Sequence, residues 1–314
     1  MKVLVTGGSG YKGSVLIPNL LKAGHDVTSF DTNWFGNYLQ DSNALTQING
    51  DIRDLGNLSL KGFDSIIHLA NVANDPAVEL NPTMSWEINV LAGHQLIEKA
   101  IKENVKHFIF ASSGSVYGIK EEEKVTEDLP LVPISTYNKT KMIAERVFIS
   151  YSKKIKFHSI RPATVCGLSP RMRLDVAVNL LTFQAITKGK IIVLGGKQVR
   201  PNIHIDDICD VYLHFLSNYK QIDSGFYNAG FENISILDIA KIIKSKINCE
   251  IEIKQSNDPR SYRQDSSKLI ETGFKPKKNV SIAIDEIIQS FNSGKLSDKS
   301  EWHTVKWMKE NNIK

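Results

Sequence analysis

Apolar residues follow two alternating patterns along this chain. Short apolar runs rich in β-branched side chains predict buried strands, and longer stretches with apolar residues at helical spacing predict amphipathic helices. In the first half, the predicted strands are residues 1–5, 25–30, 63–69, 106–111 and 157–160, and the predicted helices are residues 14–23, 82–104 and 136–151. Strands that alternate with helices predict an α/β fold with a doubly wound parallel sheet of the Rossmann type.

The pattern changes from Leu168 onward. Here the predicted helices are residues 176–187, 208–217, 236–247 and 282–291, the predicted strands are residues 191–194 and 251–253, and a last amphipathic segment surrounds residues 302–308. Because no linker separates this part from the first, we predict two interleaved domains. The larger domain would hold residues 1–167 and about 198–230, and the smaller one residues 168–197 and 231–314.

The first predicted strand leads directly into a glycine-rich loop. The sequence of residues 6–13, Thr-Gly-Gly-Ser-Gly-Tyr-Lys-Gly, fits two spacings typical of dinucleotide binding, G-x-G-x-x-G from Gly8 and G-x-x-G-x-x-G from Gly7. Glycines let the backbone approach a pyrophosphate, and the next helix directs its N-terminal amides toward it. Asp31 ends the second predicted strand, where a carboxylate would bind the ribose hydroxyls and repel a 2′-phosphate. The loop and this acid together predict a site for NAD rather than NADP.

Tyr137 and Lys141 are four positions apart on a predicted helix, so they share one face. A free tyrosine has a pKa near ~10, and a nearby ammonium group together with an oxidised nicotinamide would lower that pKa. Such a tyrosine can take a proton from a substrate hydroxyl while the nicotinamide takes a hydride. Ser113, which follows a predicted strand, is the candidate to hold the same substrate oxygen, with Ser112 and Ser115 as alternatives.

Composition argues against a nucleic-acid-binding protein, a metal-binding protein and a membrane protein. The 314 residues carry a net charge of +5, but the lysines are scattered, which favours a solvated surface over nucleic-acid binding. Cys166, Cys209 and Cys249 match no metal-site spacing, so we predict no metal and a reducing compartment. The chain starts on a predicted core strand and has no apolar run of membrane-spanning length. We therefore expect a cytoplasmic protein with no membrane partner.

Taken together, these motifs resemble those of extended short-chain dehydrogenases/reductases in the group of NAD-dependent epimerases and dehydratases, which act on nucleotide-sugars. The resemblance covers almost the whole chain. It rests on residues 6–13, Asp31, residues 51–54, residues 68–70, Asn89, Val90, Ser112, Ser113, residues 116–118, Tyr137, Lys141, Arg161, Pro162 and residues 203–207. These motifs are specific for the family and carry little information about the substrate.

The resemblance implies a role for each of these positions. Tyr137 would be the acid and base, Lys141 its electrostatic partner and ribose anchor, and Ser113 the hydroxyl anchor. The implied cofactor-binding residues are Gly7, Gly10, Tyr11, Lys12, Asp31, Asp51, Ile52, Leu69, Ala70, Asn71, Asn89, Tyr137 and Lys141. The implied substrate-binding residues are Ser113, Tyr137, Thr164, Asn179, Arg200, Arg260 and Arg263. The family fold also implies a small substrate domain and a homodimer formed through helices 82–104 and 136–151.

Positions at which this chain departs from the family pattern narrow the choice of reaction. Dehydratases that resemble this chain carry an acid after the anchoring Ser or Thr, and certain reductive epimerases carry a cysteine in the same loop, whereas this chain has Gly114 and Ser115. The remaining set is sufficient to oxidise a sugar hydroxyl to a ketone and to reduce it from the other face, which favours an epimerase, most commonly at C4. Thr164 and Cys166 stand where epimerising relatives often carry asparagine and tyrosine, which indicates an unusual sugar.

Three alternatives remain open from the sequence. A 4-ketoreductase could use the same residues, although Asp31 argues against the NADPH that biosynthetic reductases usually consume. A C2-epimerase would follow the same oxidation and reduction logic. A non-catalytic NAD-binding protein on the same fold would be expected to lack Ser113, Tyr137 or Lys141, and all three are present.

Overall fold

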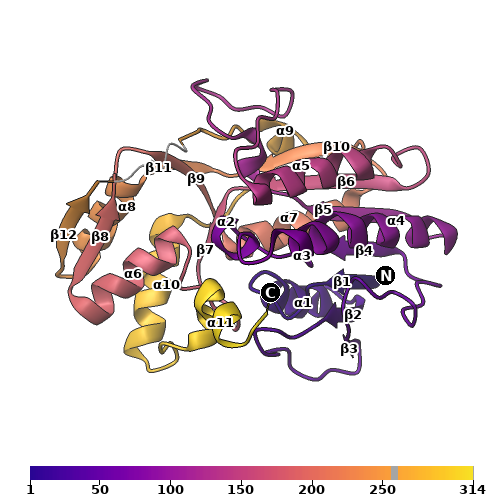
Figure 1. The fold of residues 1–314 in the computed structure, drawn as a ribbon, viewed down its shortest axis with the longest axis horizontal. Coiled ribbons are helices and arrows are strands. Elements are labelled where there is room, and N and C mark those ends of the chain that lie inside the picture. The colour runs from indigo at the N-terminus through magenta and orange to yellow at the C-terminus, as the bar shows by residue number, and fades with distance from the viewer. Residues whose placement is uncertain (256–260, 314) are drawn as a thin grey trace.

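Seven parallel strands form the central sheet of the structure, a computed structural model that describes residues 1–255 and 261–313. Their order is β10–β6–β5–β4–β1–β2–β3 (Figure 1). The strands are β1 (Lys2–Thr6), β2 (Asp26–Asp31), β3 (Leu45–Asn49), β4 (Ser65–His68), β5 (His107–Ala111), β6 (Lys156–Pro162) and β10 (Gly225–Ala229). The strand order reverses between β1 and β4, which is the switch point of a doubly wound sheet. The predicted fold class is therefore confirmed.

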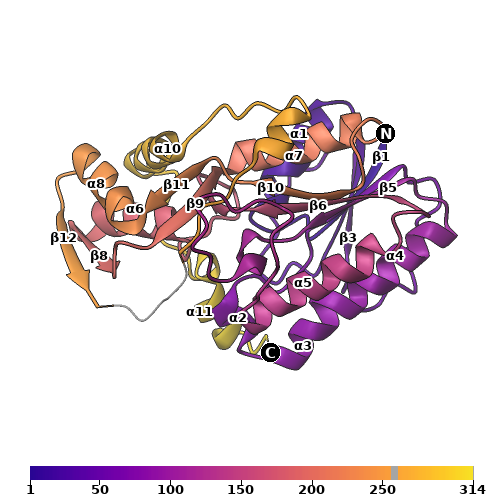
Figure 2. The ribbon, with the colours of Figure 1, turned by 90° about the horizontal axis from the view of Figure 1, so that it is seen from above.

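Helices cover both faces of this sheet (Figure 2). One face carries α1 (Gly13–Lys22) and α7 (Ile205–Asn218), and the other carries α4 (Gly93–Lys102) and α5 (Thr136–Ile149). The alternation of side chains along β1 explains the two layers, since Val3 and Val5 belong to the core with α1 while Leu4 belongs to the core with α4. Among the helices of residues 1–255 and 261–313, none combines the length and the apolar composition that a membrane-spanning segment needs.

The predicted helix over residues 82–104 is divided into three pieces. It begins as α3 (Pro82–Trp86), passes through π-helical turns at Glu87–Ala92 and continues as α4. The π-helical turns contain Asn89, whose amide accepts a hydrogen bond from the backbone N–H of Val72 at 2.8 Å. The interruption therefore lets this helix hold a loop at the edge of the sheet, as π-helical turns often do near functional sites.

A smaller body is built on the second part of the chain. It contains a three-stranded sheet of β7 (Thr164–Cys166), β9 (Val199–His204) and β11 (Glu232–Ser235), a parallel pair of β8 (Lys190–Leu194) and β12 (Glu250–Lys254), and the helices α6 (Ala177–Lys188), α8 (Ile236–Lys246) and α10 (Val280–Asn292). Val178, Ile191, Ile239 and Ile284 belong to its own apolar core. α7 and β10 return to the first sheet, so the chain crosses between the two bodies more than once. The exact domain boundaries stay a prediction.

The remaining elements are short. They are α2 (Asp75–Val78), the 3-10 turn Gly114–Tyr117, α9 (Ser267–Glu271), the 3-10 turn Ser300–Trp302 and α11 (Thr304–Glu310). α11, the last helix, lies beside α2 of the first domain in both views (Figures 1 and 2). The C-terminal end of the chain thus returns to the carboxyl edge of the central sheet.

Candidate active site

A cleft of about 660 Å³ lies at the carboxyl ends of the central strands and is lined by residues of both bodies. Doubly wound sheets bind their ligands at this edge. Most of the residues singled out from the sequence line it: Gly7, Gly10, Tyr11, Lys12, Asp31, Asp51, Ile52, Leu69, Ala70, Asn71, Ser113, Tyr137, Lys141, Thr164 and Arg200. The fold therefore gathers residues that are more than 100 positions apart in the sequence into one cavity.

The glycine loop is packed so closely that backbone atoms of neighbouring residues exclude a side chain at two of its positions. Gly7 has φ +74°, and a Cβ atom there would lie 2.6 Å from the backbone nitrogen of Ala70. A Cβ atom on Gly13 would lie 2.6 Å from the carbonyl oxygen of Gly7. At Gly10 the nearest obstacle is 3.3 Å away. The loop can thus bring its backbone and the N-terminal end of α1 close to a phosphate group.

Asp31 lies at the end of β2 and lines the cleft. Its carboxylate accepts hydrogen bonds from the backbone N–H groups of Ser9 at 3.0 Å and Asn33 at 2.8 Å. Burial raises the pKa of this carboxyl group, and these backbone hydrogen bonds oppose the rise. The carboxylate is therefore held in place beside the glycine loop, where it can accept hydrogen bonds from ribose hydroxyls.

Three buried polar atoms of residues that line the cleft lack a hydrogen-bond partner among the described residues. They are Oδ1 of Asn71, an acceptor, Nε of Arg171, a donor, and the hydroxyl oxygen of Ser112. A buried polar atom without a partner costs free energy, and hydrogen bonds to a polar ligand would remove that cost. Together with the glycine loop and Asp31, these atoms fit a dinucleotide in the cleft.

Tyr137 and Lys141 extend into the cleft from the first turns of α5. The start of this helix is fixed by Ser135, whose hydroxyl accepts a hydrogen bond from the backbone N–H of Asn138 at 3.2 Å. The Lys141 ammonium lies 5.9 Å from the centre of the Tyr137 ring and donates a 2.8 Å hydrogen bond to the carbonyl oxygen of Ala111. Burial lowers the pKa of Lys141 well below its ordinary value, and the charge of Lys12 lowers it further.

Burial raises the pKa of the Tyr137 phenol to about 12, and the charge of Asp75 adds to this rise. A hydrogen bond with the side chain of Ser113 and the charge of Arg173 oppose it. Ser113 is the second residue after β5 and is held by Ser115, whose backbone N–H donates to the Ser113 hydroxyl oxygen at 3.2 Å. The hydroxyl groups of Ser113 and Tyr137 are thus close enough to bind the same substrate oxygen.

Gly114 is covered by a side chain from a distant part of the chain. A Cβ atom on Gly114 would lie 3.1 Å from Oε1 of Gln264. The Gln264 amide donates to the carbonyl oxygen of Arg161 at 2.7 Å and to Oδ1 of Asn228 at 3.0 Å, which fixes it in place. A larger residue at position 114 would therefore have to displace a buried, hydrogen-bonded side chain.

Several predicted ligand-binding residues do not line the cleft. Asn179 is fully buried, where it accepts a hydrogen bond from the backbone N–H of Gly167 at 3.0 Å and donates to the Tyr11 hydroxyl at 3.1 Å. Asn89 is likewise buried and holds Val72. Both side chains therefore lie behind the cleft walls, and their direct contact with a ligand stays a prediction. Arg263 is exposed outside the cleft lining, and Arg260 lies outside the described residues.

Arginines of the loop after β7 contribute more to the cleft than the sequence indicated. Arg173 forms two hydrogen bonds with Asp175, at 2.9 and 3.0 Å, and both residues line the cleft. Arg171 lies 4.1 Å above the ring of Phe35. Both arginines precede a predicted helix in the sequence, but no spacing rule connects that position with the glycine loop or with Tyr137.

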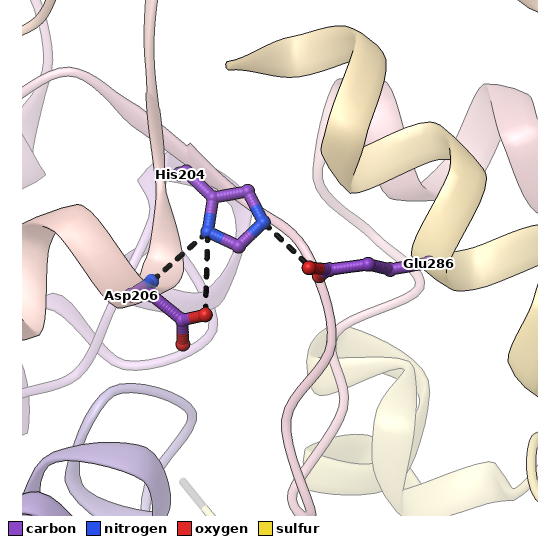
Figure 3. Close-up of side chains that lie close together, drawn as sticks. All are labelled: His204, Asp206 and Glu286. Atoms are coloured by element: carbon purple, nitrogen blue, oxygen red, sulfur yellow. Dashed lines mark hydrogen bonds and ion pairs between the residues drawn. The ribbon is translucent and has the colours of Figure 1, made fainter. Parts of the chain in front are cut away.

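Outside the cleft, His204, Asp206 and Glu286 place potential metal-binding atoms within 4.8 Å of one another (Figure 3). The His204 ring accepts a hydrogen bond from the backbone N–H of Asp206 at 3.1 Å, and its other nitrogen lies 3.1 Å from Glu286. Lys278 contacts both carboxylates at 2.6 Å. Since the lysine already supplies the positive charge, this cluster is a structural ion-pair network that caps α7 at His204.

Comparison with known proteins identifies the family. The family model described as "NAD dependent epimerase/dehydratase family" matches residues 3–230, which is more than half of the chain. The chain therefore belongs to this family, and the predicted family and its dependence on NAD are confirmed.

Individual relatives match over nearly their full length. The UDP-glucose 4-epimerase of Lactobacillus helveticus is 29% identical over 92% of this chain and 95% of the relative. An uncharacterized UDP-glucose epimerase of Bacillus subtilis is 30% identical over 85% of this chain and 90% of the relative. Among solved structures, the UDP-glucuronic acid 4-epimerase of Bacillus cereus in complex with UDP-glucuronic acid and NAD is 27% identical, with a TM-score of 0.80 over 92% of this chain and 99% of that chain.

Proposed function

We propose that this protein is an NAD-dependent nucleotide-sugar epimerase that inverts C4 of the sugar. The observation that carries this proposal is the convergence of Ser113, Tyr137 and Lys141 in one cleft with the glycine loop and Asp31. The loop after β5, residues 112–118, contains no carboxylate and no cysteine that could act as a further acid or base. The names of the relatives support the same activity.

The side chains have separate tasks in this reaction. Bound NAD would supply the hydride acceptor for the oxidation, the hydride donor for the later reduction, and a positive charge that favours ionisation of the Tyr137 phenol. The Tyr137 phenolate takes the proton from the C4 hydroxyl, and the Ser113 hydroxyl holds the same oxygen. Lys141 stabilises the phenolate. The 4-keto sugar then turns its other face toward the site, and Tyr137 returns the proton to the oxygen that becomes the inverted hydroxyl.

The structure favours this reaction over elimination of water. A dehydratase of this family needs an acid next to the anchoring hydroxyl, and the corresponding position is Gly114. The Gln264 amide covers that position, so an acid there would have to shift this hydrogen-bonded side chain. The 4-ketoreductase and the C2-epimerase share the Ser113, Tyr137 and Lys141 set and remain the alternatives that the experiment has to separate.

A second candidate concerns the sugar. Arg173 is close enough to Tyr137 for its charge to lower the pKa of the phenol, and it lines the same cleft. Because Arg173 is already paired with Asp175, its charge alone does not select a sugar carboxylate, and this candidate is supported by the related structure from Bacillus cereus, which was solved with UDP-glucuronic acid. We therefore include UDP-glucuronic acid beside UDP-glucose as a candidate substrate.

The assembly and location of the enzyme are also proposals. We propose a homodimer through α3, α4 and α5, because Leu91 is 56% exposed on this helical layer. A solution mass of one chain, measured by light scattering, would reject the dimer. A reducing cytoplasm fits Cys166, Cys209 and Cys249, which are all free and buried.

The activity is tested with the protein as purified, without added cofactor. It is incubated with UDP-glucose, UDP-glucuronic acid and the corresponding 4-keto sugars, and the products are followed by chromatography and mass spectrometry. A product of unchanged mass and new retention time supports the proposal. A product lighter by one water, or one heavier by two hydrogens that forms only with added NADH or NADPH, would replace epimerisation with elimination or reduction.

A further inference from the structure

We propose that two segments together form a C-terminal clasp that retains NAD by closing over the adenosine end of the cleft. One half of this clasp is the C-terminal segment, residues 299–308, and the other half is the loop after β2, residues 32–38. The proposal rests on the proposed function in one respect, since an epimerase needs the same cofactor molecule for oxidation and for reduction. A reductase must release its oxidised cofactor after each turnover, so a retaining clasp is useful to an epimerase in particular.

The two halves of the C-terminal clasp are joined by specific contacts between distant parts of the chain. The indole N–H of Trp307 donates to the carbonyl oxygen of Trp34 at 2.6 Å. The Tyr38 hydroxyl donates to the Glu301 carboxylate at 2.8 Å. The Lys299 ammonium lies 5.5 Å from the centre of the Tyr38 ring. These contacts connect residues more than 250 positions apart and hold the two segments together.

The inner side of the C-terminal clasp is apolar and packed into the first domain. Met308 is 1% exposed and shares a core cluster with Ile52, Trp34 and Phe35. Val305 is packed against the same cluster. α11 is too short to be stable as an isolated helix, so this burial is what holds it on the domain.

Arg171 connects the C-terminal clasp with the loop that follows β7. Its guanidinium donates to the Thr304 hydroxyl at 3.4 Å and lies 4.1 Å above the Phe35 ring. The backbone N–H of Leu174 donates to the carbonyl oxygen of Trp302 at 2.9 Å. The segment that contains Arg173 and the C-terminal clasp are therefore fixed to each other.

The position of the C-terminal clasp identifies what it covers. Residues 32–36 follow Asp31, the carboxylate placed to bind ribose, and Trp34, Phe35, Thr304, Val305 and Met308 all line the cleft beside Asp51 and Ile52. The adenosine end of the cleft is thus walled by both halves of the clasp. A dinucleotide bound there can leave only after the Trp307–Trp34 and Tyr38–Glu301 contacts open.

The experiment measures exchange of the cofactor, which does not depend on any sugar substrate. Protein as purified is assayed for NAD content and then incubated with isotopically labelled NAD, and the replacement of bound NAD is followed by mass spectrometry. Wild-type protein should carry NAD and exchange it slowly. The double variant with Tyr38→Phe and Trp307→Phe keeps an aromatic ring at each position but loses both hydrogen bonds, and it should exchange NAD at least about tenfold faster. A chain that ends at His303 should exchange it at least about 50-fold faster.

Lys306→Ala is the matched control, because this side chain is 62% exposed on the same helix. It should exchange NAD at the wild-type rate. Circular dichroism and thermal unfolding in saturating NAD show whether each variant is folded, and if the shortened chain does not fold, the double variant decides the question.

Two results would overturn the clasp. One is a wild-type protein that exchanges its NAD freely, and the other is a folded double variant that exchanges NAD as slowly as wild type. A third result separates the two proposals. If the variants release NAD faster than wild type but the protein epimerises no nucleotide-sugar, the proposed function is refuted and the clasp is still supported.

Discussion

The Lys141 ammonium lies 5.9 Å from the centre of the Tyr137 ring and is anchored by a 2.8 Å hydrogen bond to the carbonyl oxygen of Ala111. Ala111 ends β5, so the sheet itself sets the distance between the cation and the phenol. With burial raising the pKa of Tyr137 to about 12, the cation is needed to favour the phenolate.

Replacing Tyr137 with phenylalanine removes the proposed proton carrier without changing the ring. We expect kcat for epimerisation of the active nucleotide-sugar to fall by about a factor of 10³, the usual contribution of a positioned acid or base. The measurement is turnover by chromatography at saturating substrate, with NAD content checked beside it. A variant that binds NAD and keeps more than about a tenth of wild-type kcat would show that another group moves the proton.

Replacing Lys141 with methionine removes the cation beside the phenol. Because the positive charge favours the phenolate, its loss raises the pKa of Tyr137, and the rising limb of the pH profile of kcat should move to higher pH by about 1–2 units. Lys139→Met is the control, since Lys139 is exposed on the same helix, and its profile should not move. An unshifted profile for Lys141→Met would mean that the ammonium does not set the ionisation of Tyr137.

Gly114 and Gln264 should be coupled in stability. Gly114→Ala places a Cβ atom 3.1 Å from Oε1 of Gln264 and should cost about 1 kcal/mol of unfolding free energy. Gln264→Ala removes two buried hydrogen bonds and should cost about 2 kcal/mol. In the double variant the new methyl group has room, so the loss should be smaller than the sum by about 1 kcal/mol. Additive losses in denaturant unfolding would argue against a direct contact.

Buried histidines should make the fold sensitive to acid. Burial lowers the pKa of His158 from 6.5 to about 4. Between pH 6.5 and about 4, the unfolded chain therefore binds a proton at this residue that the folded chain does not bind. Stability should therefore be constant above pH 6.5 and fall as the pH drops toward 4, by about 2 kcal/mol at pH 5 from this residue alone. His158→Gln should be less stable at neutral pH but should show a flatter pH dependence in thermal unfolding. An unchanged slope would assign the acid sensitivity to other groups, of which buried His107 is the first candidate.

The sequence predicted those parts of the fold that depend on local pattern. The order of strands and helices, the glycine loop and Asp31 follow from apolar periodicity and from the need for a small residue at a close approach, as at Gly7. The π-helical turns at Glu87–Ala92 could not be predicted from helix propensity, since they coincide with the tertiary hydrogen bond that Asn89 accepts from Val72.

The site was predicted least well where it depends on contacts between distant segments. The supporting role of Asn179 comes from its packing against Tyr11 and Gly167, and the roles of Arg173 and Gln264 come from loops that only the folded chain brings to the cleft. The last helix shows the same dependence on distant contacts. In the sequence Met308 is an ordinary apolar position of an amphipathic helix, and only the structure places it in one core cluster with Ile52.

The central claim is that one retained cofactor oxidises and then reduces C4 of the sugar. The most direct measurement uses UDP-glucose that carries deuterium at C4, with protein as purified and no added cofactor, and follows the product by chromatography and mass spectrometry. The account predicts a C4 epimer that keeps the deuterium. Loss of the deuterium, loss of water, or a reaction that starts only when NADH or NADPH is added would contradict it.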